Sequence, residues 1–263
     1  KWDEATHQVT FQRGEQEPLE ADAVIVDEMS MVDLTLFSAL LRALRPGTRL
    51  VLVGDADQLP SVGAGNVLRD VIESNRFSTV RLTEIFRQAQ ESLIVTNAHA
   101  INNGEMPDLS VKDKDFFYLR RSSDREIAAT ICDLCKNRLP RAYGEMAKNG
   151  IQVICASRKG EAGTENLNVI LQQSLNPKAS YKREHSFRDR IFREGDRVMQ
   201  TRNNYDINWF RDADGKDGYG IFNGDIGVIE SIDLRNEVLN IWFDDRFVRY
   251  DFENLDQLEL SYA

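Results

Sequence analysis

The stretch 21–61, ADAVIVDEMSMVDLTLFSALLRALRPGTRLVLVGDADQLPS, contains two short apolar runs joined by an amphipathic segment. The first run, Ala23–Val26, has no alternation of apolar and polar residues, which predicts a strand buried on both faces of a parallel sheet. Asp33 is the expected N-cap of a helix whose large apolar residues recur on one face. The second run, Leu50–Val53, predicts a neighbouring strand. Two strands joined by a helix indicate an α/β fold.

Polar side chains follow both predicted strands at their carboxyl ends, where open α/β sheets bind ligands. Asp27 and Glu28 follow the first strand, and Gln58 lies just beyond the second. In P-loop NTPases an aspartate at such a strand end helps to hold Mg²⁺ on the triphosphate of ATP, and this role is expected of Asp27. Glu28 would polarise the attacking water as a general base, and Gln58 would reach the γ-phosphate. A solvated turn is the alternative for an isolated Asp-Glu pair, but two polar strand ends favour the nucleotide site.

Several segments together carry a specific resemblance to a known family. They are VDEMSMVD at 26–33, VLVGDADQLPSVGAG at 51–65, RLTEIFRQ at 81–88, CASRKGEAGTENLN at 155–168, RVMQTRNNYD at 197–206 and IFNGDIG at 221–227. In this order they resemble the motifs of RecD-type superfamily one DNA helicases, the branch of the exodeoxyribonuclease V alpha subunit and its stand-alone relatives. The resemblance runs from about Pro18 to the last residue. Relaxase-linked and Pif-type helicases remain alternatives.

The resemblance implies an activity and partners. It implies an ATP-dependent enzyme that moves 5′ to 3′ along single-stranded DNA, at a duplex junction, in DNA repair or recombination. It also leaves open a place among the partner subunits of an exonuclease complex.

An architecture follows from the same resemblance: two partial RecA-like P-loop NTPase domains with parallel sheets, and an inserted small SH3-like β-barrel. It divides the chain into a hairpin remnant (1–18), the C-terminal part of the first RecA-like domain (19–105), part of the second (106–194), the barrel (195–258) and a return to the second domain (259–263). Turn spacing supports the barrel independently, with short strands expected at Arg197–Thr201, Gly227–Ile232, Val238–Trp242 and Phe247–Asp251. Other strands are expected at Thr79–Leu82, Phe116–Leu119 and Ile151–Cys155. Residues 7–11 alternate like a strand, either as the returning half of a hairpin or in a frayed terminus.

Arg87 follows the strand expected at Thr79–Leu82. An arginine in this place would stabilise the charge on the γ-phosphate in the transition state. A lone arginine is usually part of a surface salt bridge, but its position within RLTEIFRQ favours the functional interpretation.

A second group of candidates concerns DNA. Ser157, Arg158 and Lys159 follow the strand expected at Ile151–Cys155 and precede a helix. A hydroxyl, two cations and backbone N–H groups together suit a phosphate of the DNA backbone. The resemblance adds Asn203 and Asn204 as DNA contacts, for which turn chemistry is the alternative.

Composition limits the remaining classes. The net charge of −10 (33 basic minus 43 acidic residues) argues against a broad basic surface, but it allows a narrow basic channel. Six basic residues fall within 178–193, where a solvated loop is the alternative to a DNA contact. No apolar run approaches the length of about 20 residues that a membrane span needs, and no secretory leader is visible. We therefore expect a cytoplasmic protein without membrane contact; the odd number of cysteines suits a reducing compartment.

No G-x-x-x-x-G-K-[ST] segment occurs in the sequence, which also begins without Met. We therefore expect the central part of a helicase, inactive by itself. One alternative is a metal-dependent nuclease that uses Asp27, Glu28, Asp55 and Asp57 as a two-metal site, although Gln58 has no role in that scheme. The other is a non-catalytic DNA-binding or assembly module.

Overall fold

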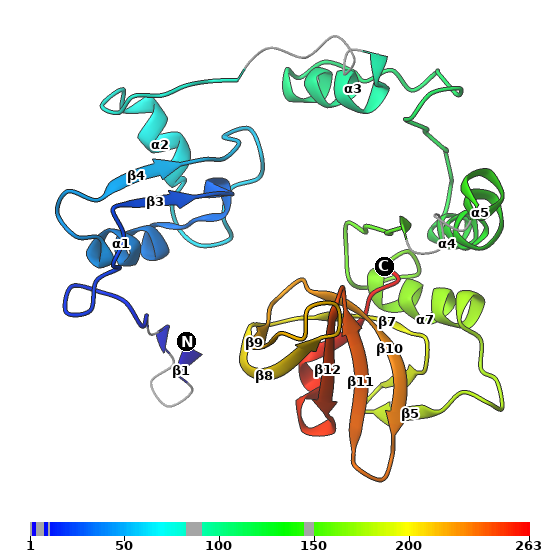
Figure 1. Cartoon of the computed structure of the whole chain (residues 1–263). Helices are drawn as coiled ribbons and strands as arrows, with labels where there is room; N and C mark the ends of the chain where they lie inside the picture. The colour runs from blue at the N-terminus through cyan, green and yellow to red at the C-terminus, as the bar shows by residue number, and fades with distance from the viewer. Residues whose placement is uncertain (1, 4–7, 10, 83–90, 145–149) are drawn as a thin grey trace. The chain divides into compact units, whose positions relative to one another are not determined.

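The computed structural model describes residues 2–3, 8–9, 11–82, 91–144 and 150–263. It shows a mixed α/β chain that divides into two compact units, Lys1–Tyr118 and Leu119–Ala263 (Figure 1). Among the described helices, none is both long enough and apolar enough to cross a membrane.

The first unit is built around two parallel strands, β3 (Ala23–Val26) and β4 (Arg49–Leu52), joined by helix α1 (Leu34–Ala43) (Figure 1). The strands pair in register, from Ala23 opposite Arg49 to Val26 opposite Leu52. The Asp33 carboxylate accepts a hydrogen bond of 2.7 Å from the backbone N–H of Leu36, which caps the first turn of α1. The expected strand–helix–strand unit and its N-cap are confirmed.

The prediction that the first strand is buried on both faces was wrong. A small apolar cluster covers one face: Met29, Val32, Val67 and Leu68 are buried, and Val26, Phe37 and Leu52 pack against them. Its members come from the strands, from α1, from the short helix η1 (Met29–Met31) and from α2 (Val67–Glu73). On the opposite face Ile25 is 70% exposed and Val51 is 40% exposed. Within the part of the chain that the structure describes, helices therefore cover only one side of this pair of strands.

Outside that core, the first unit contains short or irregular segments. Strands β1 (Trp2–Asp3) and β2 (Gln8–Val9) pair antiparallel, and helix α3 (Leu93–Asn102) is capped by Ser92. The strands expected at Thr79–Leu82 and Phe116–Leu119 are not formed, so these two predictions were wrong. Their side chains are largely exposed, with Val80 at 84% and Leu82 at 97%. An apolar run becomes a strand only where a ladder partner lies beside it.

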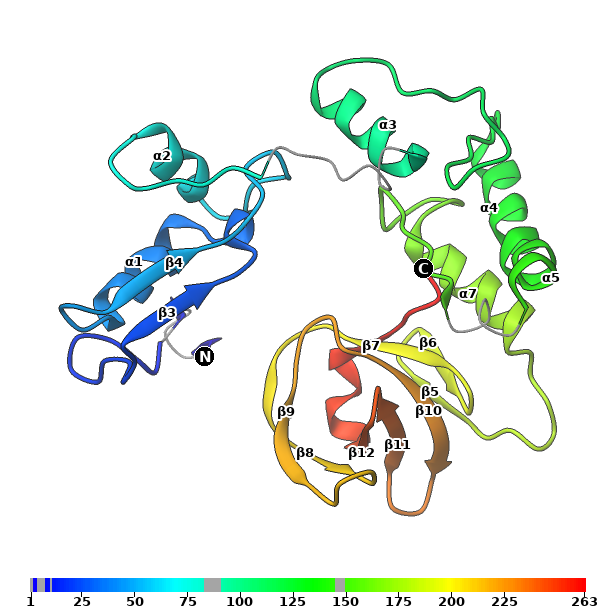
Figure 2. The ribbon, with the colours of Figure 1, turned by 45° about the horizontal axis from the view of Figure 1, so that its top comes forward.

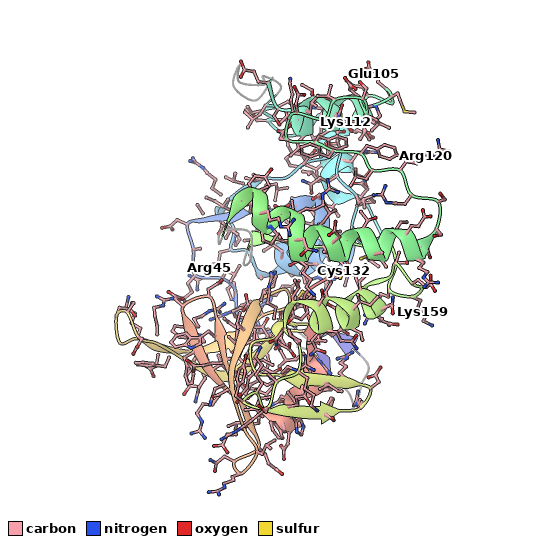
Figure 3. The ribbon with its side chains drawn as sticks, turned by 90° about the vertical axis from the view of Figure 1, so that its right-hand side faces the viewer. Arg45, Glu105, Lys112, Arg120, Cys132 and Lys159 are labelled. Atoms are coloured by element: carbon pink, nitrogen blue, oxygen red, sulfur yellow. The ribbon has the colours of Figure 1, made fainter. Side chains whose placement is uncertain are left out.

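The helical part of the second unit pairs two segments. One is the run formed by α4 (Asp124–Asp133), the π-helical η3 (Leu134–Arg138) and α5 (Leu139–Tyr143); the other is α7 (Thr164–Leu175). Figure 3 shows α4 beside α7, with Cys132 labelled on α4. The Cys132 Sγ atom lies 3.2 Å from Ser174 Oγ, across the two helices. The strand expected at Ile151–Cys155 is not formed, so that prediction was also wrong.

The largest element of the second unit is a seven-stranded antiparallel sheet that curls into a half-barrel (Figure 2). Its strand order is β13-β7-β10-β11-β12-β8-β9, and a separate hairpin, β5 (Glu184–Phe187) and β6 (Arg190–Arg193), lies next to β7 in sequence. The strands are β7 (Arg197–Gln200), β8 (Asn204–Arg211), β9 (Asp217–Ile221), β10 (Ile226–Asp233), β11 (Val238–Phe243), β12 (Arg246–Asp251) and β13 (Leu258–Leu260). The expected strands after residue 195 are confirmed as β7, β10, β11 and β12. The sequence prediction missed β8, β9 and β13.

A buried carboxylate joins α7 to this sheet. Asp196 is fully buried, and burial raises the pKa of its carboxyl while hydrogen bonds to it act in the opposite direction. One oxygen accepts from Asn176 Nδ2 (2.7 Å) and Tyr262 Oη (2.9 Å), and the other accepts from Gln172 Nε2 (2.5 Å) and the backbone N–H of Arg193 (2.7 Å). These donors come from α7 and the residue that follows it, from the last residue of β6, and from Tyr262 beyond β13. They fill every acceptor position of the carboxylate, so the network fixes α7 against the half-barrel.

Candidate functional site

The carboxyl ends of β3 and β4 form the first candidate site. The ladder extends past the strands, because the N–H of Val53 donates to the Val26 carbonyl (2.8 Å) and the N–H of Met29 donates to the Val53 carbonyl (2.9 Å). Asp27 and Glu28 lie between these bonds, directly beside the end of β4. Both side chains are exposed. The parallel register therefore brings the two acidic residues to the place where the loop after β4 begins.

Glycine at position 54 allows this close approach. A Cβ atom at Gly54 would lie 2.9 Å from the backbone nitrogen of Met29 and 3.0 Å from Leu68 Cδ2. Contacts this short are not tolerated by real side chains when the neighbour is backbone. Any larger residue would therefore push the end of β4 away from Asp27 and Glu28.

Glu28 has an unusual backbone conformation. Its φ is +52° and its ψ is +42°, in the left-handed region that glutamate rarely adopts. The Asp27 carboxylate accepts a hydrogen bond of 2.8 Å from the Glu28 N–H, which helps to hold this conformation. A non-glycine residue in this region costs on the order of 1–2 kcal/mol, and such strain occurs where the direction of a side chain matters.

Gln58 lies on the loop that follows β4. A local turn forms there, because the Asp57 N–H donates to the Asp55 carboxylate (2.9 Å) and the Gln58 N–H donates to the Asp55 carbonyl (3.3 Å). Arg69 of α2 donates to the Ala56 carbonyl (3.0 Å), so the turn is attached to the helix behind it. The Gln58 side chain is exposed.

The rest of this loop lies against the start of α1. The Leu34 N–H donates to the Ala64 carbonyl (2.9 Å), and a Cβ atom at Gly63 would clash with Asp33 Oδ2. Ser61 Oγ donates to the carbonyls of Gly63 (3.1 Å) and Gly65 (3.3 Å). The small residues of SVGAG thus keep the loop against the N-terminus of α1. Sequence reasoning used this segment only as part of a motif and missed its packing role.

Arg87 lies outside the described residues, so its position stays a prediction. Among the residues that the structure describes, no three His, Cys, Asp or Glu side chains are gathered as a metal-holding group. The carboxylates of the nuclease alternative, Asp27, Glu28, Asp55 and Asp57, do not form such a group.

The second candidate site is the loop before α7. Its backbone is largely satisfied from within: the N–H groups of Thr164 and Glu165 donate to the carbonyls of Ser157 (3.2 Å) and Arg158 (3.1 Å). The Ser157 hydroxyl donates to the Lys159 carbonyl (3.0 Å). The hydroxyl and N–H groups expected to receive a phosphate are therefore engaged in the loop itself. The two cationic side chains remain as the groups that a phosphate can meet.

These two cations differ in their surroundings. Lys159 is exposed on the loop just before α7 (Figure 3). Arg158 Nη2 donates to Glu259 Oε1 (2.8 Å), and its Nε lies 3.7 Å from Glu165 Oε1. The hydrogen bond and the charge of Glu259 raise the pKa of the Arg158 guanidinium. Sequence reasoning gave no reason to select Glu259.

Asn203 and Asn204 both make hydrogen bonds within the second unit. Asn203 Oδ1 accepts from the N–H of Asn223 (2.9 Å), and Asn203 Nδ2 lies 3.3 Å from the Tyr205 hydroxyl. Asn204 Nδ2 donates to Gln257 Oε1 (3.0 Å). These contacts give both asparagines a structural role that joins distant parts of the chain, and their contact with DNA stays a prediction.

The basic segment 178–193 is mostly engaged in the fold. Its partners include carboxylates and carbonyls: Lys178 and Arg193 both pair with Glu184 (2.7 and 2.6 Å), Arg190 pairs with Glu259 (3.0 Å), Arg183 donates to the Ile232 carbonyl (2.9 Å), and Lys182 donates to Asn176 Oδ1. The local excess of positive charge is therefore largely structural.

Comparison with known proteins places these features in a family. An AAA domain profile matches residues 3–117, and the profile of the SH3 domain of ATP-dependent RecD-like DNA helicases matches residues 167–243. The ATP-dependent RecD2 DNA helicase of Deinococcus radiodurans is 32% identical over 254 residues, which cover 96% of this chain and 31% of the relative. The RecBCD enzyme subunit RecD of Mycolicibacterium smegmatis is 28% identical over 221 residues, covering 79% of this chain and 36% of the relative.

Among solved structures, a chain from a study of forked DNA unwinding by two coordinating Pif1 helicases aligns with 92% of this chain. The alignment covers 58% of the Pif1 chain, at 20% identity and a TM-score of 0.48. The fold and the sequence matches define a mixed α/β protein that combines an AAA domain portion with an SH3-like domain. The chain belongs to the RecD-like family of superfamily one DNA helicases. It spans about a third of the length of these curated relatives.

Proposed function

We propose that this chain is the central part of an ATP-dependent DNA helicase that moves 5′ to 3′ along single-stranded DNA in repair or recombination. The observation that carries the proposal is the aligned end of β3 and β4, where Asp27 and the left-handed Glu28 project beside the Gln58 loop. Membership of the RecD-like family supports the same activity. In this proposal the chain contributes to two RecA-like domains and an inserted barrel, with the boundaries expected from the sequence.

The residues at the strand ends suit a triphosphate and its metal ion. Asp27 is an exposed carboxylate with one oxygen oriented by the Glu28 N–H, and Mg²⁺ in such sites takes one or two carboxylates together with phosphate oxygens. Mg²⁺ would neutralise charge on the phosphates. Glu28 accepts the proton of the attacking water as general base, Gln58 orients the γ-phosphate, and Arg87 offsets the charge that develops on it.

Single-stranded DNA is the proposed substrate of the second unit. Arg158 and Lys159 contact phosphates of the DNA backbone, and Ser157 shapes the loop that carries these two side chains. Asn203 and Asn204 contact the same strand of DNA. Such contacts do not depend on base sequence. RecD of Mycolicibacterium smegmatis is named as a subunit of the RecBCD enzyme, and for this protein we extend the proposal to partner subunits of an exonuclease complex.

The sequence contains no G-x-x-x-x-G-K-[ST] segment. That loop supplies most of the backbone contacts to nucleotide phosphates in P-loop enzymes. We therefore propose that the 263 residues alone hydrolyse no ATP. In isolation they act as a DNA-binding or assembly module.

The test replaces Glu28 by Gln in the natural protein that carries this sequence. The change keeps the shape of the side chain and removes its basicity, so single-strand-stimulated ATP hydrolysis should fall by roughly 10²–10⁴-fold. ATP binding, measured with a fluorescent nucleotide, should stay within about twofold. Glu73→Gln, at the exposed end of α2, is the matched control and should leave hydrolysis unchanged. Near-normal hydrolysis by the Glu28→Gln protein would show that another group prepares the water.

A further inference from the structure

Arg158 is held by a carboxylate from a distant part of the chain. Its Nη2 donates to Oε1 of Glu259, 101 positions later, at 2.8 Å. Glu259 lies in β13, which pairs with β7 through Glu259 opposite Met199. The Glu259 side chain is 26% exposed, whereas that of Arg158 is 64% exposed. The carboxylate is thus anchored in the half-barrel, and the arginine reaches it from the loop before α7.

A second arginine binds the same oxygen. Arg190 Nη2 donates to Glu259 Oε1 (3.0 Å), and Arg190 Nη1 donates to the Leu258 carbonyl (2.7 Å). One carboxylate therefore faces two guanidinium groups. If Arg158 left this cluster, Glu259 would keep its bond to Arg190, and no unpaired charge would remain beside β13.

A phosphate can take the place of the carboxylate. Both groups present oxygen atoms that match the fork of a guanidinium. Ion pairs with one highly exposed partner are weak, because water and salt compete with them. The Ser157 hydroxyl does not add a hydrogen bond to the phosphate, because it already donates to the Lys159 carbonyl. Whether Arg158 is available to a phosphate therefore depends chiefly on Glu259, with Glu165 as a more distant second carboxylate.

We propose that Glu259 competes with DNA phosphate for Arg158. In the absence of DNA the carboxylate binds the guanidinium, and a backbone phosphate displaces it on binding. Glu259 then sets the affinity and the salt dependence of single-strand binding at this loop. The inference rests on the proposed role of Arg158 in DNA binding and adds to it an internal acceptor that the sequence motif does not include.

The experiment compares Glu259→Gln with the unchanged natural protein. Glutamine keeps the size of the side chain and an oxygen for Arg190, but it removes the negative charge. Binding of fluorescein-labelled single strands of mixed sequence should tighten about two- to fivefold near 0.1 M salt. The log–log slope of affinity against salt should steepen by up to about 0.7, the value for one additional phosphate neutralised on a single strand. Glu253→Gln, an exposed carboxylate of η4 (Phe252–Gln257), is the matched control and should change neither quantity.

A double-mutant cycle separates this inference from the function on which it rests. If Arg158→Ala leaves affinity and salt slope unchanged, Arg158 does not bind DNA and the proposed contact fails. If Arg158→Ala weakens binding, the effect of Glu259→Gln should vanish in the Arg158→Ala background. A Glu259→Gln protein that binds no more tightly, or that tightens equally without Arg158, overturns the competition.

A measurement on the unsubstituted protein guards against a folding defect in the variant. Arginine Nε–H resonances, assigned by NMR, should shift for Arg158 when an unlabelled single strand is added. The Arg190 resonance should move much less, because its bonds to Glu259 and Leu258 persist. Equal shifts of both resonances, or no shift of Arg158, would contradict the proposal.

Discussion

The parallel strands of the first unit and the curled sheet of the second differ in what holds them. Ile25 of β3 is 70% exposed, whereas Ile241 of β11 and Val248 of β12 are fully buried. Around β3 and β4 the candidate residues are positioned by backbone hydrogen bonds and close glycine contacts. In the second unit apolar burial and the Asp196 network supply the order. The proposed chemistry thus lies on the less densely packed unit, where small backbone changes matter more than lost apolar contacts.

The largest effect is expected when isoleucine is replaced by alanine in the core of the second unit and, for comparison, on the open face of the first. Ile241→Ala should destabilise the second unit by about 2–5 kcal/mol, because it leaves a cavity in a filled core. Ile25→Ala, on the open face of β3, should change the stability of the first unit by no more than about 0.5 kcal/mol. Hydrogen exchange resolved by peptide reports each unit separately in the 263-residue chain. Equal losses of stability in the two units would contradict the claim that they are held together differently.

A smaller effect is expected from a single methyl group at the end of β4. Gly54→Ala places a Cβ atom 2.9 Å from the Met29 nitrogen, so the backbone must shift. Overpacking of this kind costs about 1–3 kcal/mol, and here it would also displace Glu28. Gly14→Ala is the control, because nothing lies within 4 Å of its Cβ position. Thermal melting and hydrogen exchange of residues 23–33 would measure both variants. If Gly54→Ala changes neither the melting temperature nor the hydrogen exchange, the close approach of Gly54 to Met29 does not constrain the backbone.

The smallest effect has the opposite sign. Glu28→Gly relieves a positive φ and should stabilise the first unit by about 1 kcal/mol, while ATP hydrolysis by the natural protein is lost. Glu237 in the second unit has a φ of +55°, so Glu237→Gly should stabilise by a similar amount and leave hydrolysis unchanged. Melting curves and turnover are the two readouts. Destabilisation by Glu28→Gly would show that the glutamate side chain stabilises the turn.

Local patterns predicted the elements whose partners are near in sequence. β3, the Asp33 cap, α1 and β4 follow from apolar runs and capping chemistry in one short stretch. The runs Thr79–Leu82 and Ile151–Cys155 have similar composition but no ladder, because pairing depends on what lies beside a strand. β8 and β9 were missed because their Asp, Asn and Gly residues indicate turns. Their strand structure depends on hydrogen bonds to each other and from β8 to β12.

The candidate site was likewise predictable from the sequence where it depends on local patterns, and it was not predictable where it depends on the folded backbone or on distant contacts. That Asp27 and Glu28 follow a strand and face a neighbouring strand end follows from the sequence and from parallel pairing. The left-handed backbone of Glu28 has no local signal, because glutamate does not favour that region. The contact between Arg158 and Glu259 joins positions 101 residues apart, and only the folded chain brings them together.

The central claim is that the strand-end site drives DNA strand separation, and the most direct measurement is unwinding by the natural protein. Two labelled duplexes would be compared, one with a 5′ single-stranded tail and one with a 3′ tail, each with and without ATP and Mg²⁺. Strand separation should occur on the 5′-tailed duplex, require ATP and disappear with Glu28→Gln, with all strands recovered intact. Separation from the 3′ tail alone, cleavage of a strand without ATP, or normal unwinding by Glu28→Gln would contradict the account.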